Sequence, residues 1–233
     1  SFDNTMRIQG AYDYLINTRN NMKPMPTWLY SQAFCMDCWE HYALNTGELL
    51  VQFGSVVAAG GKGIMLFQSD VKSRAKDSTA WDNGGKFLSS MYAIREILRI
   101  SDVDGAKYDT DADHAIVSVL GGPETALVIF LNTNADSYND VTCYAGIGRH
   151  WNFHSEKINK TKIYLPQNLK DLASRENKSP SEYFEIVEVH NGSLKTDFDD
   201  ADGDVSDESF PLKNVELGSS ASVVRMFMLH PKQ

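Results

Sequence analysis

The sequence predicts two structural classes in succession: α/β over residues 1–103 and an antiparallel β-sandwich over residues 104–233. The first prediction rests on the order helix, strand, helix, strand, helix, which is typical of parallel strands joined by crossover helices. The second rests on about seven short segments of alternating polarity separated by turn residues. Asp and Gly cluster over residues 101–112, where the boundary is expected.

The first helix and strand follow from the spacing of apolar residues. Over residues 5–20 these residues recur at helical spacing, and Pro24 and Pro26 come soon after. Residues 27–34 (TWLYSQAF) form a short run rich in aromatic residues, which is typical of a buried strand. A loop is expected over residues 35–45.

Residues 46–103 continue the alternation of helix and strand. Thr46 is expected to cap a helix that the glycines at 60–61 end. Residues 63–69 (GIMLFQS) are a continuous apolar run, typical of a parallel strand covered on both faces. A polar loop is expected over 70–86, and a further helix from about Phe87.

The remainder of the chain is predicted to form short strands separated by turns. The expected strands are 114–120, 125–132, 140–144, 160–165, 183–190, 212–217 and 222–229. The segment 121–124 (GGPE) is typical of a hairpin turn between the first two.

Composition excludes several classes of protein. The chain has 233 residues, is 42% hydrophobic and 23% charged, and carries a net charge of −9. These values argue against disorder, collagen and coiled coil. No apolar run approaches the ~20 residues of a membrane helix. Because no basic cluster is present, a nucleic-acid partner is not expected.

One segment is strongly acidic: residues 197–208 (DFDDADGDVSDE) hold seven carboxylates in twelve residues. Such a run is typical of a solvated loop. If Asp202 and Gly203 took positions five and six of an EF-hand loop, Phe198 would fall at position one, where it cannot ligate. No cofactor is therefore expected, although a looser calcium site in 197–208 is an open alternative.

The three cysteines are too few for a disulfide scaffold. Cys35 and Cys38 have Cys-x-x-Cys spacing, and either a disulfide that stiffens the loop or two free buried thiols would fit. A zinc site would need two more ligands, and His41 is the only nearby histidine. Cys143, in an expected strand, is interpreted as a small core residue.

The location of the protein is predicted from its sequons. Asn159, Asn177 and Asn191 each begin an Asn-x-Ser/Thr sequence, although Pro180 would hinder modification of Asn177. The first residues show no signal-peptide pattern and no initiator Met, as in a mature, processed or trimmed chain. We expect an extracellular or cell-surface protein.

Two strands are too few for a stable parallel sheet covered on both faces. We therefore expect a partner, an N-terminal polypeptide that supplies the missing strands. The alternative is a smaller α/β unit that is complete in itself.

The sequence PTWLYSQAF, the segment TGELLVQFGSVVAAGGKGIMLFQSD and the pattern WDNGGK at 81–86 together resemble the last two βα units of (β/α)8-barrel glycoside hydrolases of the large retaining clan. The resemblance implies the end of a TIM barrel followed by a β-sandwich. It also implies hydrolysis of an extracellular glycan, which would be the ligand.

Sites in this fold lie at the C-terminal ends of the barrel strands. Glycoside cleavage needs two carboxyl groups that flank the bond. The candidate catalytic residues are Asp37, Glu40 and Asp70. The candidate substrate-binding residues are Gln32, Trp39, Gln68, Trp81 and Asp82. Alternatively, the two tryptophans pack at the barrel mouth and the acids are solvated loop residues.

One departure from the clan bears on activity. The resemblance implies a nucleophilic Glu at the end of the seventh strand, and residues 27–34 contain none. Two functions therefore stay open. The chain is a fragment or subunit of a glycoside hydrolase-like protein with at least one catalytic carboxylate outside it, or it is a non-catalytic surface or matrix protein that binds glycan or protein through the same scaffold.

Overall fold

A computed structural model of the chain describes residues 10–32, 44–67, 78–103, 107–143, 146–195 and 205–232. The helices are α1 (Gly10–Met22), α2 (Thr46–Ala58), α4 (Ser78–Ala93), α5 (Arg95–Ile100), α6 (Gln167–Arg175) and α7 (Pro180–Tyr183). The strands are β1 (Trp28–Gln32), β2 (Gly63–Phe67), β3 (Lys107–Thr110), β4 (Ala115–Gly121), β5 (Ala126–Asn132), β6 (Ala135–Cys143), β7 (Gly146–Phe153), β8 (Glu156–Tyr164), β9 (Phe184–His190), β10 (Ser193–Lys195), β11 (Ser209–Leu217) and β12 (Val224–Pro231). Within these ranges, no helix is long and apolar enough to cross a membrane.

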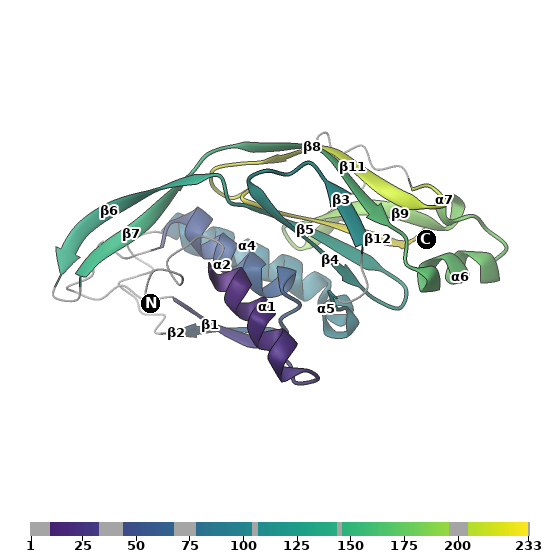
Figure 1. Cartoon of the computed structure of the whole chain (residues 1–233), viewed down its shortest axis with the longest axis horizontal. Helices are drawn as coiled ribbons and strands as arrows, with labels where there is room; N and C mark the ends of the chain where they lie inside the picture. Colours follow the sequence, from purple (N-terminus) through teal and green to yellow (C-terminus); the bar gives the residue numbers. More distant parts are fainter. Residues whose placement is uncertain are drawn as a thin grey trace.

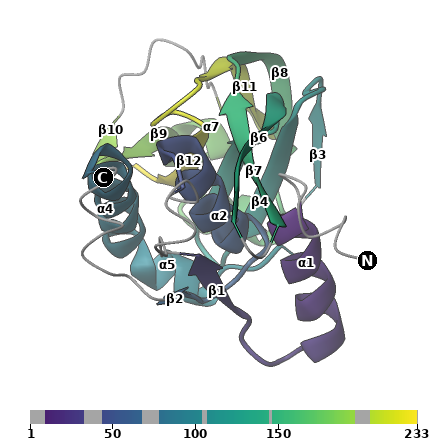
Figure 2. The ribbon, with the colours of Figure 1, turned by 90° about the vertical axis from the view of Figure 1, so that its left-hand side faces the viewer.

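The elements form a mixed α/β structure in layers (Figure 1). A three-stranded antiparallel sheet, β11-β8-β3, lies over a five-stranded antiparallel sheet, β10-β9-β12-β5-β4. Below the larger sheet lie the helices α1, α2, α4 and α5, and below these the parallel pair β1-β2. The hairpin β6-β7 extends away from the rest of the molecule. The view in Figure 2 places α1 on the side of β1, and α4 and α5 on the side of β2.

The centre of the five-stranded sheet is buried on both faces, and β5 is buried along its whole length. Leu127, Ile129 and Leu131 point toward the helices and belong to one core. Val128 and Phe130 alternate with them and belong to a second core, between the two sheets. This double burial explains why β5 reads as a continuous apolar run although its neighbours are antiparallel.

The second core joins the two antiparallel sheets. The smaller sheet contributes Ile158, Ile163, Phe210 and Leu212, all fully buried. The larger sheet contributes Phe227, which packs edge-on against Phe130 with ring centroids 5.8 Å apart. The hairpin expected at 121–124 is confirmed, since Gly122 N–H donates to Thr125 O at 2.8 Å and β4 pairs with β5.

Helix α2 lies between the parallel pair and the large sheet, and all its residues except Gln52 are buried. Gly54 permits this position, because a Cβ there would lie 2.5 Å from Leu131 Cδ2. The prediction that Thr46 caps α2 is wrong by one residue. Asn45 is the cap, because its side chain accepts from Glu48 N–H at 3.0 Å and completes a reciprocal capping box.

The loop expected over 70–86 is wrong in its second half, because α4 begins at Ser78. The two glycines that suggested a loop lie inside this helix. Gly84 serves packing, since a Cβ there would lie 3.0 Å from Leu49 Cδ2, whereas Gly85 has nothing within 4 Å. A glycine at the crossing brings α4 close to α2, and the packing overrides the low helix propensity of glycine.

Several strands and helices after residue 103 were not predicted, or were predicted to be shorter than they are. The sequence predicted no strand for β3, β7 or β10, and no helix for α6 or α7. β8 begins at Glu156, four residues before its expected start. Its sequence EKINKTKIY is polar on the outer face, and Ile158, Thr161 and Ile163 are its buried residues. A strand with one solvated face is easily mistaken for a loop when polar residues dominate.

Candidate functional site

The C-terminal ends of the two parallel strands lie side by side. β1 and β2 pair in register from Trp28 opposite Gly63 to Gln32 opposite Phe67. The segments 33–43 and 68–77 therefore follow two neighbouring strand ends, which is where sites occur in folds of this kind. Gln32, a predicted substrate-binding residue, ends β1 at this edge.

Most of the predicted site falls in these two segments. The predicted residues that lie outside the described part of the chain are Cys35, Asp37, Cys38, Trp39, Glu40, Gln68 and Asp70. Trp81 and Asp82 lie on α4 instead of in a loop, Trp81 partly buried and Asp82 exposed. Their assignment to substrate binding stays a prediction.

A buried polar cluster fixes the start of α2, the helix that leads from this edge. Glu48 Oε1 accepts from Trp151 N–H of β7 at 2.7 Å, and Nδ1 of His150 lies 3.1 Å from the same oxygen. Glu48 Oε2 accepts from Asn45 N–H at 2.9 Å. Asn45 in turn donates through Nδ2 to Trp151 O at 2.9 Å. The Glu48 and His150 side chains are each only 5% exposed.

This cluster has a positioning role. Two backbone N–H groups donate to the carboxylate of Glu48, the ring of His150 lies beside it, and little solvent reaches it, so its contacts hold parts of the fold together. It ties the first turn of α2 to β7, two elements about a hundred residues apart. The sequence around Glu48 does not reveal this role, because its partner on β7 is a tertiary neighbour.

His150 and His154 lie four residues apart, but their side chains have different partners. His150 faces Glu48, whereas His154 is exposed and lies 2.9 Å from Asp136. Among the residues with described placement, no three His, Cys, Asp or Glu side chains are grouped to hold a metal. The described end of the acidic run includes Glu208, which pairs with Lys170 at 3.1 Å, and residues 197–204 lie outside the description.

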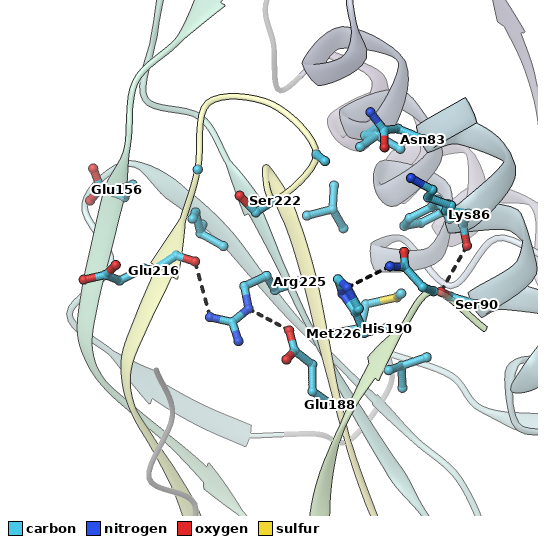
Figure 3. A pocket seen from close by; sticks show the side chains of 18 of the residues that line it. Asn83, Lys86, Ser90, Glu156, Glu188, His190, Glu216, Ser222, Arg225 and Met226 are labelled. Atoms are coloured by element: carbon cyan, nitrogen blue, oxygen red, sulfur yellow. Dashed lines mark hydrogen bonds and ion pairs between the residues drawn. The ribbon is translucent and has the colours of Figure 1, made fainter. Parts of the chain in front are cut away.

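A polar crevice of about 680 Å³ lies between α4 and the strands β9, β11 and β12 (Figure 3). Its floor holds an ion pair, with Arg225 Nε donating to Glu188 Oε1 at 2.8 Å. Both side chains are about nine-tenths buried. The Arg225 guanidinium also lies 5.1 Å from the centroid of the Phe227 ring. Such a pair ends the apolar core between the sheets without leaving an unpaired charge.

The rim of the crevice mixes charges of both signs, with Glu156 and Glu216 opposite Lys86 (Figure 3). His190 lies on the wall, and burial, then Lys195, lowers its pKa below the ordinary value. At neutral pH this imidazole is therefore neutral. Among the lining residues Phe87, which is buried, is the only Phe, Tyr or Trp. The crevice suits a polar ligand. None of the predicted catalytic or substrate-binding residues lines it, although Asn191 of a predicted glycosylation site does.

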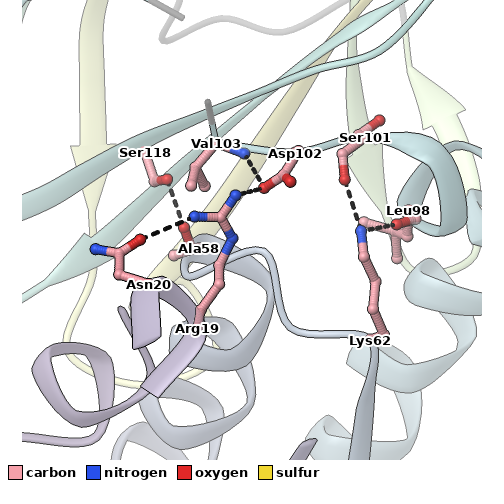
Figure 4. A network of polar contacts seen from close by, with 9 residues as sticks. All are labelled: Arg19, Asn20, Ala58, Lys62, Leu98, Ser101, Asp102, Val103 and Ser118. Carbon is pink, nitrogen blue, oxygen red and sulfur yellow. Dashed lines mark hydrogen bonds and ion pairs between the residues drawn. The ribbon is translucent and has the colours of Figure 1, made fainter. Parts of the chain in front are cut away.

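A second polar network connects the starts of the parallel strands with the end of α5 (Figure 4). Lys62 Nζ donates to the carbonyls of Leu98 at 2.7 Å and Ser101 at 2.6 Å, which caps the C-terminus of α5. Arg19, buried at the end of α1, forms an ion pair with Asp102. Burial lowers the pKa of Lys62, and the carboxylate of Asp102 opposes that shift.

The three predicted glycosylation sites are all exposed. Asn159 lies on β8, and the hydroxyl of Thr161 in its sequon is buried, 2.8 Å from Thr110 Oγ1. Asn177 and Asn191 sit in turns with φ of 53° and 47°. Their exposure is compatible with modification, which stays a prediction.

Comparisons with known proteins gave structural matches only. No family model matches the chain, and no curated protein does. A GH30 endoxylanase from Clostridium papyrosolvens C71 superposes with a TM-score of 0.40 and 13% identity over 97% of this chain and 46% of its own. A glycoside hydrolase family 30 subfamily 8 xylanase, Xyn30A, from Clostridium acetobutylicum gives a TM-score of 0.35 and 11% identity over 91% of this chain and 44% of its own.

A third structure, described as a glycoside hydrolase, gives a TM-score of 0.42 and 9% identity over 95% of this chain and 46% of its own. The chain thus spans less than half the length of each protein that it matches. Superpositions with TM-scores this low do not by themselves establish a shared fold.

Proposed function

We propose that this chain is the C-terminal portion of a glycoside hydrolase-like protein, in which a further polypeptide segment completes a (β/α)8 barrel and the two antiparallel sheets form a β-sandwich. The observation that carries the proposal is the unit β1-α2-β2, two parallel strands joined by a buried helix. Sequential parallel strands with a crossover helix are the repeating unit of such barrels.

The exposed face of the parallel pair supports this interpretation. Leu29 and Ile64 pack toward the helices, on the covered face. On the opposite face, Trp28 is 55% exposed and Met65 is 42% exposed. Parallel sheets are normally covered on both faces, and two strands alone are marginally stable. In a completed barrel these two side chains would face its packed interior.

The sequence resemblance supplies the function within this proposal. The substrate would be an extracellular glycan, in keeping with three exposed sequons. Asp37, Glu40 and Asp70 would provide carboxylates, and Trp39 and Trp81 would provide flat surfaces for sugar rings. At least one catalytic carboxylate would come from the completing segment.

A second candidate is a non-catalytic protein that binds glycan or protein through the same scaffold. The observation that favours it is the composition of the strand ends. Neither β1 (WLYSQ) nor β2 (GIMLF) contains an acidic residue, and the described acid closest in sequence after β1, Glu48, is buried and accepts from two backbone N–H groups.

A polysaccharide panel separates these functions. The natural polypeptide containing this chain, with any copurifying partner, is assayed for release of reducing ends and for retardation in gels that contain each polysaccharide. Hydrolysis that falls at least tenfold in Asp70→Asn, but not in the control Asp109→Asn on exposed β3, would support the enzyme. Retardation without hydrolysis would support the binding protein, and neither response to any polysaccharide would contradict both.

A further inference from the structure

The outer face of the three-stranded sheet β11-β8-β3 is basic, although the chain as a whole is acidic. This sheet is the outermost layer, on the opposite side of the molecule from the parallel pair β1-β2 (Figure 1). Its inner side chains belong to the core between the sheets, so the side chains that alternate with them point outward. Glu216 pairs with Lys157 at 3.9 Å, and Asp109 is the other carboxylate that these strands place on the face. The lysines of the face are Lys107, Lys157, Lys160, Lys162 and Lys213.

Two of these lysines lie at directly opposed positions of the sheet. Lys160 of β8 is the register partner of Lys213 of β11, and both are exposed. Like charges directly opposite each other destabilise a sheet. Lysines often protect an edge strand from pairing with another chain, but β8 is the central strand of this sheet. Edge protection therefore does not explain Lys160, whereas an anion bound beside the two ammonium groups would relieve their repulsion.

An aromatic ring lies at one end of this row of cations. Tyr164 follows Lys162 on the same face of β8, and Lys107 is its register partner on β3. The Lys162 ammonium lies 5.2 Å from the centroid of the Tyr164 ring, and Tyr164 is 40% exposed. A ring flanked by two cations suits a pyranose that carries an anionic group. The ring can contact the apolar face of the sugar, while the lysines donate charge-assisted hydrogen bonds to the anion.

From the opposed lysines, the flanked ring and the charge of this face, we propose that the outer face of β8 binds an acidic polysaccharide, whose sugars carry carboxylates or sulfates. The polymer lies along β8, with one sugar on Tyr164 and its anions at Lys160, Lys162 and Lys213. From Tyr164 to Lys157 the strand spans about 23 Å, which is long enough to contact several consecutive sugars. This site goes beyond the proposed function, because it is on the other side of the molecule from β1 and β2 and requires no catalysis.

Other polyanions fit this face less well. An acidic polypeptide would use the lysines but has no sugar ring to place on Tyr164. Duplex DNA carries one charge per about 1.7 Å of its axis. Repulsion from the rest of a chain with a net charge of −9 is therefore strongest for DNA.

The experiment uses the natural polypeptide that contains this chain, with any copurifying partner. It is produced without N-linked glycan, so that Asn159 on β8 stays unmodified. The probes are polygalacturonate and dextran sulfate. Their matched controls are methyl-esterified polygalacturonate and dextran, which keep the sugars and lack the charge. Binding is measured as retardation in gels that contain each polymer, at low and high salt, with poly-glutamate and duplex DNA as competitors.

We expect the acidic polymers to bind about tenfold more tightly than their uncharged controls, and added salt to weaken this binding. Lys160→Gln and Lys162→Gln are each expected to weaken it about threefold, and together about tenfold, because each removes one charge contact. Tyr164→Ala is expected to weaken it about threefold through loss of the ring. The control Lys178→Gln removes an ammonium that lies 5.9 Å from the Tyr183 ring, outside this sheet, and is expected to change nothing. Melting temperatures check that each variant is folded.

Equal binding of charged and uncharged polymers, unchanged binding in the double lysine variant, or stronger competition by poly-glutamate or DNA than by free polygalacturonate would overturn the inference. Binding that appears only after the aspartates of residues 197–204 are replaced by asparagine would also overturn it. That result would show that this acidic segment of the chain occupies the face.

Failure of this inference is distinguishable from failure of the proposed function. Retardation that the double lysine variant abolishes belongs to the outer face of β8. Hydrolysis or retardation that survives in that variant belongs to the strand ends of β1 and β2. The first result without the second contradicts the proposed function alone, and the second without the first contradicts this inference alone.

Discussion

Replacing Glu48 by alanine is expected to destabilise the chain strongly. The substitution removes the acceptor for Trp151 N–H at 2.7 Å and for Asn45 N–H at 2.9 Å, and it leaves the buried ring of His150 without its carboxylate. A buried polar group left unsatisfied costs about 1–3 kcal/mol. Loss of the capping box adds about 1 kcal/mol. With partial relaxation of the site, we expect a loss of about 3–5 kcal/mol in the free energy of unfolding.

The chain contains a matched control for this substitution. Ser179 and Glu182 form the same capping box at the start of α7, but on the surface. Glu182→Ala removes equivalent local hydrogen bonds without leaving a buried group unsatisfied, so a clearly smaller loss is expected. Glu48→Gln is expected to fall between the two, because it keeps one acceptor oxygen and turns an N–H donor toward another donor.

The measurement is urea unfolding followed by far-ultraviolet circular dichroism and by tryptophan fluorescence. Comparable slopes against denaturant concentration would allow the unfolding free energies of the three variants to be compared. If Glu48→Ala lost no more stability than Glu182→Ala, the reasoning that burial makes the α2 cap a tertiary connection would be refuted.

Two further results are expected. Gly84→Leu should destabilise the chain by about 2 kcal/mol or more, because its side chain would overlap Leu49 where α4 crosses α2. Gly85→Ala, with open space around it, should stabilise α4 by about 0.5–1 kcal/mol. Thermal unfolding measures both changes in stability, and equal effects of the two substitutions would contradict the packing of α4. The backbone N–H and then the hydroxyl of Ser179 hold the pKa of Glu182 below its ordinary value. Its stabilising contribution is therefore present above the ordinary Glu pKa and is lost as the pH falls through the lowered one. Carboxyl NMR titration should show that pKa rising toward the ordinary value in Ser179→Ala, and an unchanged value would show that the hydroxyl has no part in it.

The order of elements was predictable wherever local pattern and tertiary packing agree. α2 and the strands β4, β5 and β9 were expected within about two residues of where they lie. Their apolar periodicity and the flanking turn residues specify them locally. The start of α4 was missed, because Gly84 disfavours a helix locally and is needed only for contact with α2.

The candidate site was predictable only in position along the chain. Strand ends can be located from sequence within about two residues, whereas the register of β1 with β2, which places Gln32 beside Phe67, comes from the structure. The connection between Glu48 and His150 could not be found that way, since it joins α2 to a strand that was itself missed. The ion pair Glu188–Arg225 could not be predicted for a different reason: both strands were expected, but their pairing joins residues far apart in sequence.

The central claim is that β1 and β2 are two neighbouring strands of a larger closed parallel sheet. The most direct measurement is a crystal structure of the natural polypeptide that contains this chain, together with any chain that copurifies with it. The account predicts an eight-stranded parallel barrel in which β1 and β2 lie side by side, Trp28 and Met65 face the interior, and a further strand pairs with the free edge of β2. A structure in which β1 and β2 remain an isolated pair, with Trp28 and Met65 in solvent, would contradict it.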